Sequence, residues 1–246
     1  MSRYDFNAQR LFVESDLVEG GTVACTPAQA NYLRNVLRLG AGDAILVFNG
    51  RDGEWRAELA EAGRRATTLA VRAQTRRQEG GPDIDYLFAP LKRARLDYMV
   101  EKATEMGAAR LRPVLTRRTV AERVNVERIR AHAIEAAEQC GILRLPEVSA
   151  PEKLERVVVG WDAARPLVFC DEDSPEPCPF TALARIPPGP VAVLIGPEGG
   201  FDPAERELLS SQPFVTRISL GPRILRADTA AVAVLALVNA VLGDWR

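Results

Sequence analysis

The sequence is poor in potential metal ligands. It contains one histidine and four cysteines among 246 residues, and Cys25, Cys140, Cys170 and Cys178 form no CxxC pair. Zinc sites need several such ligands at short spacing, so we expect no metal site. Isolated cysteines are typical of free thiols in a reducing cytoplasm, and we expect a cytoplasmic protein.

Long apolar runs are also lacking. The longest, residues 229–242, is shorter than the roughly 20 residues that a membrane-spanning helix needs. The N-terminal sequence MSRYDFNAQRLFV has no apolar signal-peptide core. We therefore expect no membrane association, and we expect residues 229–242 to form a buried helix or an interface helix.

The chain has no large excess of charge, because its formal net charge is −1. This value excludes a histone-like or tail-type nucleic-acid binder. The charge is uneven, however: residues 92–130 contain 11 Lys and Arg against 5 Asp and Glu, a net charge of +6. Such a segment is typical of a polyanion-binding surface or of ordinary solvated helix faces, and charge alone leaves both interpretations open.

The common phosphate-binding motifs are absent, since the chain contains neither GK[ST] after a glycine-rich loop nor GxGxxG. Instead, two apolar runs end at glycine-proline pairs. Val191–Ile195 precedes Gly196 in GPEGGF, and Val215–Leu220 precedes Gly221 in GPRILRADT. Both runs have the length of buried parallel strands, and we expect them side by side. Ligands of open α/β sheets bind at the carboxyl ends of such strands, so the two loops are candidate binding loops.

Helix signals follow both loops. Asp202 and Pro203 are typical of an N-cap and first turn, and Asp228 or Thr229 could cap the second helix. A glycine pair allows a ligand to approach the backbone closely, but it also allows a tight strand-to-helix turn. A pocket of backbone groups would suit an adenine ring and its ribose better than a triphosphate.

The chain divides into two parts by composition. Residues 1–75 read as short strands, with a helix starting at Thr26-Pro27 and a hairpin at 44–59, which indicates a small β-barrel. Residues 76–82, RRQEGGP, read as a linker. From there to 246, strands alternate with helices, which predicts an α/β domain with a parallel sheet covered on both faces. We therefore place the domains at 1–75 and 76–246.

Several segments together resemble one family. GPEGGF and SLGPRILRADTA near the C-terminus, NYLRNVLRL near the N-terminus, and KATEMGA and EAAEQC between them resemble the ordered motifs of the RsmE family. These are SPOUT-superfamily RNA methyltransferases, and the resemblance covers nearly the whole chain. It implies a PUA-like barrel followed by a SPOUT-type α/β domain with a C-terminal trefoil knot. It also implies formation of 3-methyluridine in small-subunit (16S) ribosomal RNA, with S-adenosylmethionine as methyl donor.

The resemblance assigns site residues by position. A uridine nitrogen must lose its proton before it attacks, so a cation and a general base are needed. Arg226 is the candidate cation, and Asp228 is the candidate base or only a helix cap. The expected cofactor contacts come from the first loop and its strand and from the second loop: Leu194, Gly196, Glu198, Gly199, Leu220, Gly221, Ile224 and Leu225.

Seven basic residues are candidates for contacts to the RNA phosphate backbone, and such contacts supply affinity rather than sequence choice. Each could equally be a solvated surface charge. They are Arg10, Arg34, Arg38, Lys92, Arg93, Arg95 and Lys102. The superfamily resemblance also implies a homodimer, for which the apolar helix at 229–242 is a suitable interface.

One departure from the family pattern keeps alternatives open. The family usually has LRTETA where this chain has LRADTA, so Ala227 loses a hydroxyl and Asp228 is one methylene shorter. A catalytically impaired ribosome-assembly factor is therefore one alternative. Methylation of a different RNA and a small-molecule enzyme with a nucleotide cofactor are the others.

Overall fold

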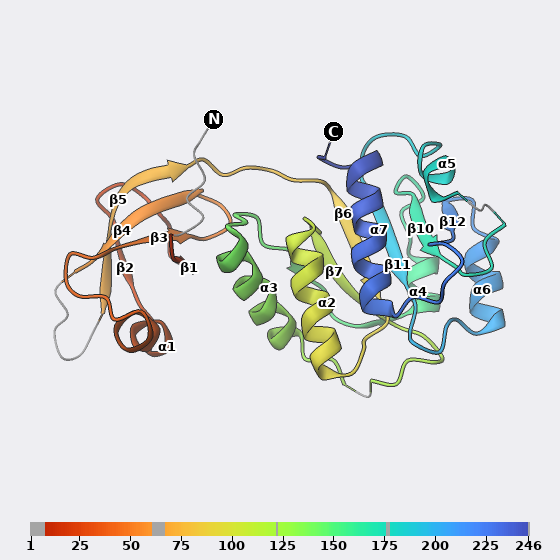
Figure 1. Ribbon diagram of the computed structural model, residues 1–246, viewed down its shortest axis with the longest axis horizontal. Coiled ribbons are helices and arrows are strands. Elements are labelled where there is room, and N and C mark those ends of the chain that lie inside the picture. The colour runs from red at the N-terminus through yellow and green to blue at the C-terminus, as the bar shows by residue number, and fades with distance from the viewer. Residues whose placement is uncertain (1–7, 61–66, 122, 176–177, 246) are drawn as a thin grey trace. The chain divides into compact units, whose positions relative to one another are not determined.

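The computed structural model describes residues 8–60, 67–121, 123–175 and 178–245 (Figure 1). Residues 1–7, which begin the segment considered above for a signal peptide, lie outside the described residues. The chain forms two compact units. Unit 1 comprises Met1–Gly80 and Ala137–Leu145, and unit 2 comprises Gly81–Ala136 and Pro146–Arg246.

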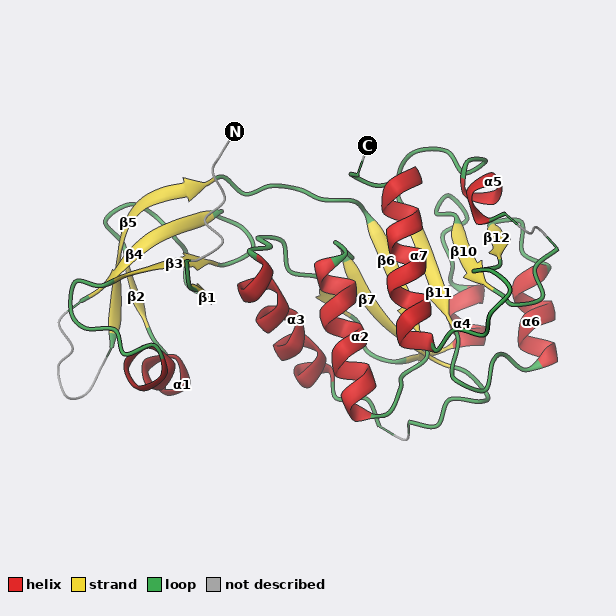
Figure 2. Ribbon diagram, viewed as in Figure 1, coloured by secondary structure: helices red, strands yellow, loops and turns green. Residues whose placement is uncertain are grey.

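Unit 1 is built on a five-stranded sheet in the order β1-β3-β4-β5-β2, which curls into a half-barrel (Figure 2). Among the described strand pairs of this unit, β1 and β3 run parallel and the other neighbours are antiparallel. The hairpin predicted at 44–59 is confirmed as β3 and β4. The strands are β1 (Arg10–Phe12), β2 (Thr22–Ala24), β3 (Ala44–Phe48), β4 (Glu54–Leu59) and β5 (Thr68–Arg76).

The helix of unit 1 begins as predicted but changes type. Thr26 caps α1 (Pro27–Asn31) in a capping box with Gln29. The chain then continues as a π-helix, η1 (Tyr32–Val36). Arg38 lies beyond its end with φ of +59°. Arg34 and Arg38 are four residues apart, but because of this change they do not share one α-helical face.

Unit 2 contains a seven-stranded sheet in which every described pairing is parallel. Its main path is β12-β10-β11-β6-β7-β8, and β9 pairs with β7. The strands are β6 (Ile84–Phe88), β7 (Arg110–Leu115), β8 (Glu147–Val148), β9 (Glu152–Lys153), β10 (Leu167–Cys170), β11 (Val191–Ile195) and β12 (Val215–Ile218).

Helices cover both faces of this sheet, which confirms the predicted α/β class (Figure 1). On β6, Tyr86 packs in a core with α2 and α7, whereas Leu87 packs in a second core with α4 and α6. The trefoil knot stays a prediction. The helices are α2 (Arg93–Glu105), α3 (Val126–Cys140), α4 (Leu154–Val159), α5 (Pro179–Leu183), α6 (Pro203–Ser210) and α7 (Ala227–Val241). Within the described ranges, none of the helices has the length and apolar character of a membrane span.

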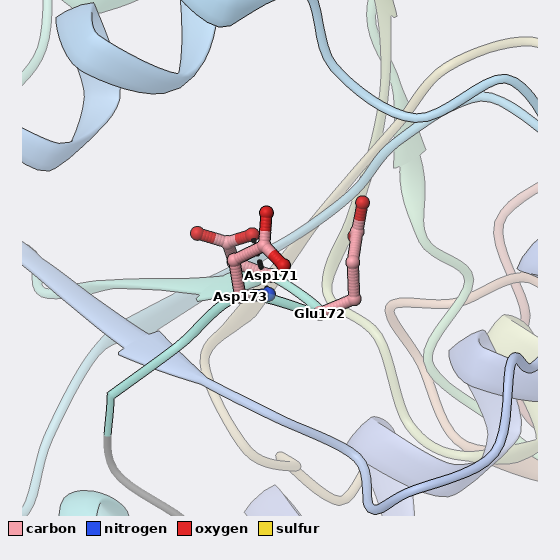
Figure 3. A group of neighbouring side chains, drawn as sticks. All are labelled: Asp171, Glu172 and Asp173. Atoms are coloured by element: carbon pink, nitrogen blue, oxygen red, sulfur yellow. Dashed lines mark hydrogen bonds between the residues drawn. The ribbon is translucent and has the colours of Figure 1, made fainter.

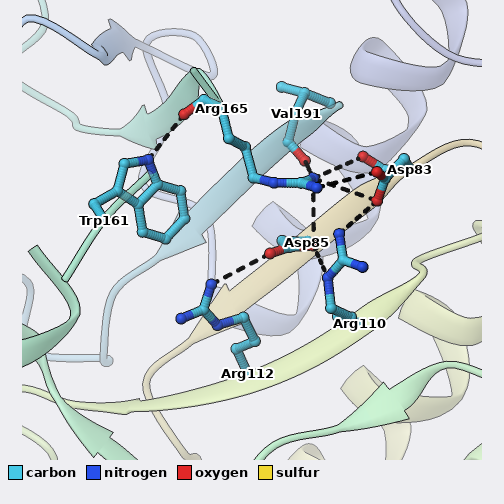
Figure 4. A network of polar contacts seen from close by, with 7 residues as sticks. All are labelled: Asp83, Asp85, Arg110, Arg112, Trp161, Arg165 and Val191. Carbon is cyan, nitrogen blue, oxygen red and sulfur yellow. Dashed lines mark hydrogen bonds and ion pairs between the residues drawn. The ribbon is translucent and has the colours of Figure 1, made fainter. Parts of the chain in front are cut away.

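A charged network ties together the amino ends of three central strands (Figure 4). Asp85, which is 2% exposed, forms ion pairs with Arg110, Arg112 and Arg165. Burial tends to raise the pKa of Asp83, but Arg165 and Arg110 together hold that pKa below its ordinary value. The network fixes the strands at the edge of the sheet opposite the glycine-rich loops.

Candidate functional site

Three parallel strands, rather than two, carry the candidate site at their carboxyl ends. The sequence predicted β11 and β12 as neighbours, and this was wrong because β10 lies between them. Its residues Leu167–Phe169 pair with β11 on one side, and Leu167–Cys170 pair with β12 on the other. A third loop, following Cys170, therefore lies between the two predicted ones.

The first loop turns sharply after β11. Gly200 has φ of +70° and its N–H donates to the Pro197 carbonyl over 2.9 Å. A Cβ at Gly196 would overlap the ring of Phe201, which packs edge-on against Phe169 with ring centroids 4.9 Å apart. The close approach of Phe201 thus explains the glycine at 196.

Helix α6 starts directly after this loop, as predicted. Asp202 accepts a hydrogen bond from Ala204 N, and Glu205 accepts one from Asp202 N, so the two form a capping box. Glu205 is 2% exposed and also accepts the Arg117 backbone N–H over 2.8 Å. One buried carboxylate therefore joins the loop after β7 to the start of α6.

Three arginines contact the first loop and the N-cap of α6, and two of them, Arg117 and Arg118, were not among the predicted site residues. Arg95 pairs with Glu198, and Arg118 Nη1 donates to the Gly199 carbonyl over 2.8 Å. Arg117 Nη1 donates to Asp202 Oδ1 over 2.9 Å. Arg117 and Arg118 form an Arg-Arg pair one residue after the end of β7, where side chains reach the binding edge of a parallel sheet.

The second loop presents charged groups at the start of α7. Gly221 has φ of +100°, and Ile224 is fully exposed, whereas Leu220 and Leu225 pack against the core. Arg226 is exposed and occupies the N-cap position without a side-chain capping bond.

Asp228 lies in the first turn of α7. Its Oδ1 accepts the N–H of Thr229 over 2.9 Å. The expectation that Asp228 or Thr229 caps this helix was therefore wrong, because the helix starts earlier, at Ala227.

The third loop carries the acidic cluster Asp171, Glu172 and Asp173 (Figure 3). Asp171 is 2% exposed and accepts Arg217 Nε over 2.9 Å. Arg206 pairs with Glu172 over 2.8 Å and also with Asp173. Because the two guanidinium groups engage all three carboxylates, the cluster is part of an ion-pair network next to the site.

A surface pocket of about 520 Å³ lies between this network and α6. Phe201 of the first loop and Arg118 contribute to its wall. The pocket therefore adjoins the first loop. Its other lining residues are Asp173, Pro203, Arg206, Glu207, Ser210 and Arg217.

Leu194 does not face the loops. It is fully buried in β11 and packs in the core with α4 and α6. Only its backbone is therefore placed to contribute to a site.

The basic candidates of unit 2 cluster at α2. Lys92 is exposed at its N-cap, and Arg93 is exposed in its first turn. Lys102 pairs with Glu105 over 2.6 Å and lies 5.4 Å from the centroid of the Tyr98 ring.

The basic candidates of unit 1 differ in exposure. Arg38 is exposed and Arg34 is half-buried. Arg10, in contrast, is 3% exposed, and its Nε donates to Glu54 Oε2 over 2.9 Å. The expectation that Arg10 contacts RNA is corrected, because its guanidinium group lies in the core of unit 1.

Comparisons with known proteins identify relatives along the whole chain. The profile of the family described as "RNA methyltransferase domain" matches residues 79–239, and that of "RNA methyltransferase PUA domain" matches residues 26–71. The chain is 32% identical over 240 residues to ribosomal RNA small subunit methyltransferase E of Synechocystis, covering 96% of this chain and 78% of that protein. It is 28% identical over 236 residues to the Rickettsia conorii protein of the same name, covering 94% of each.

Solved structures with the same fold include proteins with a bound cofactor. A methyltransferase from Legionella pneumophila, solved with bound SAM, has a TM-score of 0.83 and 26% identity and covers 97% of this chain and 99% of that one. Ribosomal RNA small subunit methyltransferase E of Neisseria gonorrhoeae, bound to S-adenosyl methionine, has a TM-score of 0.85, with 98% and 100% coverage. The latter is 22% identical, so it supports the fold alone.

Proposed function

The chain belongs to the RNA methyltransferase family matched by residues 79–239, and we propose on this premise that it forms 3-methyluridine in small-subunit ribosomal RNA. It is an S-adenosylmethionine-dependent rRNA methyltransferase; the choice of uridine N3 is the proposal. The observation that carries the proposal is the pair of glycine-containing loops after β11 and β12. Both lie within the matched segment and at the binding edge of a parallel sheet.

The loop residues fit the methyl donor. Gly221 leaves its backbone uncovered, since nothing lies within 4 Å of a Cβ placed there, and Gly199 is exposed, with its carbonyl bonded to Arg118. Leu220 and Leu225 are half-buried, so they offer an apolar wall. Neutral backbone groups and an apolar wall suit an adenine ring and ribose, so these residues, with Gly196 and Glu198, would hold S-adenosylmethionine.

The start of α7 supplies the acceptor chemistry. The sulfonium group of the donor supplies an electrophilic methyl, which needs no metal. Asp228 accepts the N3 proton of uridine, and the exposed guanidinium group of Arg226 stabilises the resulting ring anion. When bound, the donor would supply the methyl group for the new bond to N3 and would leave as a neutral thioether. The remaining task of the chain is to align the acceptor with the methyl.

The test is methyl transfer to rRNA and to assembled small subunits, followed by mass spectrometry of the nucleosides. Wild type is expected to yield 3-methyluridine, and Arg226→Ala none. The fold should persist, because the Arg226 side chain makes no capping bond. Arg223→Ala is the matched control, since Arg223 is another exposed arginine of the same loop.

Other outcomes would change the function. A different methylated nucleoside would contradict the choice of uridine N3. Failure to bind S-adenosylmethionine in calorimetric titration would favour a catalytically impaired assembly factor. Near-normal turnover by Arg226→Ala would remove its proposed role.

The partner is ribosomal RNA, and the protein is a homodimer of the cytoplasm in this proposal. Half-buried apolar residues along α7 support an interface there: Val232, Ala233, Ala236, Leu237 and Val241. The exposed cations Arg38, Lys92 and Arg93 support an RNA-binding surface on each unit. Light scattering at micromolar concentration tests the dimer, and a monomer mass would contradict it.

A further inference from the structure

A short turn after β7, residues 116–119, contacts the first loop although none of its residues was a predicted site residue. Its backbone closes through the Thr119 N–H, which donates to the Thr116 carbonyl over 3.1 Å. The Thr119 hydroxyl accepts the Thr116 N–H over 2.9 Å, so side chain and backbone fix the same turn. Arg117 and Arg118 are exposed at its tip. The turn therefore presents these two residues in one defined position.

Glu205 of α6 connects this turn to the end of the first loop. The residue is 2% exposed, and its two carboxylate oxygens bind different segments. Oε1 accepts the Arg117 backbone N–H over 2.8 Å, and Oε2 accepts the Asp202 N–H over 3.0 Å. Hydrogen bonds to an ionised carboxylate are stronger than those between neutral groups, and losing one at a buried site is costly. The carboxylate therefore fixes the turn and the start of α6 relative to each other.

The tip of the turn makes two more contacts with the same region through its side chains. Arg118 Nη1 donates to the Gly199 carbonyl over 2.8 Å, and Arg117 Nη1 donates to Asp202 Oδ1 over 2.9 Å. Gly199 and Gly200 give the first loop large backbone freedom, so the loop needs outside contacts to keep one shape. The turn supplies such contacts at the glycine pair and directly after the loop, at the N-cap of α6.

We propose that the turn 116–119 is a fourth segment of the donor site, and that Glu205 is the positioning residue through which it holds the first loop in the shape that binds S-adenosylmethionine. The inference rests on the proposed function, in which Gly196, Glu198 and Gly199 contact the donor. Glu205 acts through the two backbone N–H groups that it binds. Because the loop is ordered beforehand, donor binding does not have to order it, and the Kd is lower. At saturating donor the loop is ordered in either case, so the rate of methyl transfer should not depend on Glu205.

The test is Glu205→Gln, studied at a temperature at which circular dichroism shows the variant to be folded. Glutamine keeps the size and one acceptor oxygen, but its NH2 group cannot accept the N–H that faces the other position. The Kd of S-adenosylmethionine in calorimetry is expected to rise roughly 3- to 30-fold, because the donor must then order the loop. The kcat at saturating donor should change less than about twofold. Glu207→Gln, which changes an exposed carboxylate of the same helix, is the matched control and should leave the Kd unchanged.

Thr119→Val is a second variant, which leaves Glu205 in place. Valine has nearly the shape of threonine but no oxygen to accept the Thr116 N–H, so the turn is loosened. The Kd of the donor should rise roughly 2- to 10-fold. In an Arg118→Gln background, Glu205→Gln should raise the Kd by a smaller factor than in wild type, since both residues act on the same loop.

An unchanged Kd in Glu205→Gln would overturn the inference, and a lower melting temperature with that unchanged Kd would mark a structural role. A loss of kcat at saturating donor without a change in Kd would also overturn it, because Glu205 would then serve the chemical step. If Glu205→Gln does not fold, the Kd of Thr119→Val decides in the same way. A wild-type protein that binds the donor but forms no 3-methyluridine would overturn the proposed function, while the Kd values would still decide the inference.

Discussion

The buried ion pair between Arg10 and Glu54 is open to a direct energetic test by Arg10→Met. The two side chains are 1% and 3% exposed, so the substitution leaves a carboxylate in the core of unit 1. Breaking such a pair costs about 3–5 kcal/mol. Glu54 keeps the hydroxyl of Thr75 at 2.8 Å and the guanidinium group of Arg76 at 3.5 Å, so we expect the lower end, about 3 kcal/mol.

Hydrogen exchange followed peptide by peptide can measure this loss within unit 1. A loss of about 3 kcal/mol corresponds to roughly 150-fold faster exchange of the most protected amides. Peptides across β4 should show it, while peptides across β11 in unit 2 serve as the internal reference. Replacing both partners, as in Arg10→Met with Glu54→Leu, should restore most of the protection, because apolar substitutes for a buried pair are often neutral or stabilising.

The opposite result would return Arg10 to the RNA-binding surface. In that case Arg10→Met would leave hydrogen exchange unchanged and would weaken RNA binding. The dependence of RNA affinity on salt would also decrease by the amount expected for about one lost phosphate contact. That outcome would refute the assignment of Arg10 to the core. Arg38→Met, which changes an exposed arginine of the same unit, is the matched control for the RNA measurement.

Three further predictions concern the glycines of the first loop, the pH dependence of stability through Asp52, and the contact of Arg118 with the first loop. In urea unfolding, Gly196→Ala should lower the free energy of unfolding by about 1–3 kcal/mol, because the new Cβ displaces the Phe201 ring. Gly199→Ala should change it by less than about 0.5 kcal/mol, because the nearest atom to a Cβ there is 3.7 Å away. Equal effects of the two variants would contradict this explanation. Hydrogen bonds from the Leu17 backbone and the Asn49 side chain hold the pKa of Asp52 below its ordinary value. The ionised carboxylate therefore adds to the free energy of unfolding at neutral pH, and this contribution is lost as pH falls below about 4. Asp52→Asn should lower the free energy of unfolding at pH 7, and the difference from wild type should vanish in acid. Arg118→Gln removes the hydrogen bond to the Gly199 carbonyl in the first loop. It should weaken S-adenosylmethionine binding roughly 3- to 10-fold in calorimetry without lowering the melting temperature. Unchanged affinity would show that this hydrogen bond does not order the loop for binding.

Local signals in the sequence predicted much of the fold. The apolar run Val191–Ile195 became β11, and Asp202-Pro203 started α6 with the expected cap. The turn residues between β3 and β4 predicted their hairpin. These features depend on neighbours within a few residues, so periodicity, turn chemistry and capping preferences are enough to identify them.

Features that depend on distant segments were not predictable in this way. The insertion of β10 between β11 and β12 is a matter of strand order, which local pattern does not contain. The burial of Arg10 depends on Glu54, 44 residues away. The contact of Arg118 with Gly199 spans 81 residues. In each case the sequence indicates a residue type, and only the fold supplies the partner.

The start of α7 shows how the structure sharpens one open alternative. From the sequence, Asp228 could be a base or only a cap. In the structure, the N-cap position belongs to Arg226, which makes no capping bond, and Asp228 lies in the first turn. A serine or aspartate at the cap would stabilise the helix by about 1 kcal/mol, and a cation at this end opposes the helix dipole. The start of α7 lacks a capping side chain, but Asp228 places a carboxylate in the first turn, where it accepts the N–H of Thr229 and favours the helix dipole. Asp228 therefore does not occupy the N-cap position, but its carboxylate still stabilises the first turn of α7, and its role as the base stays a prediction.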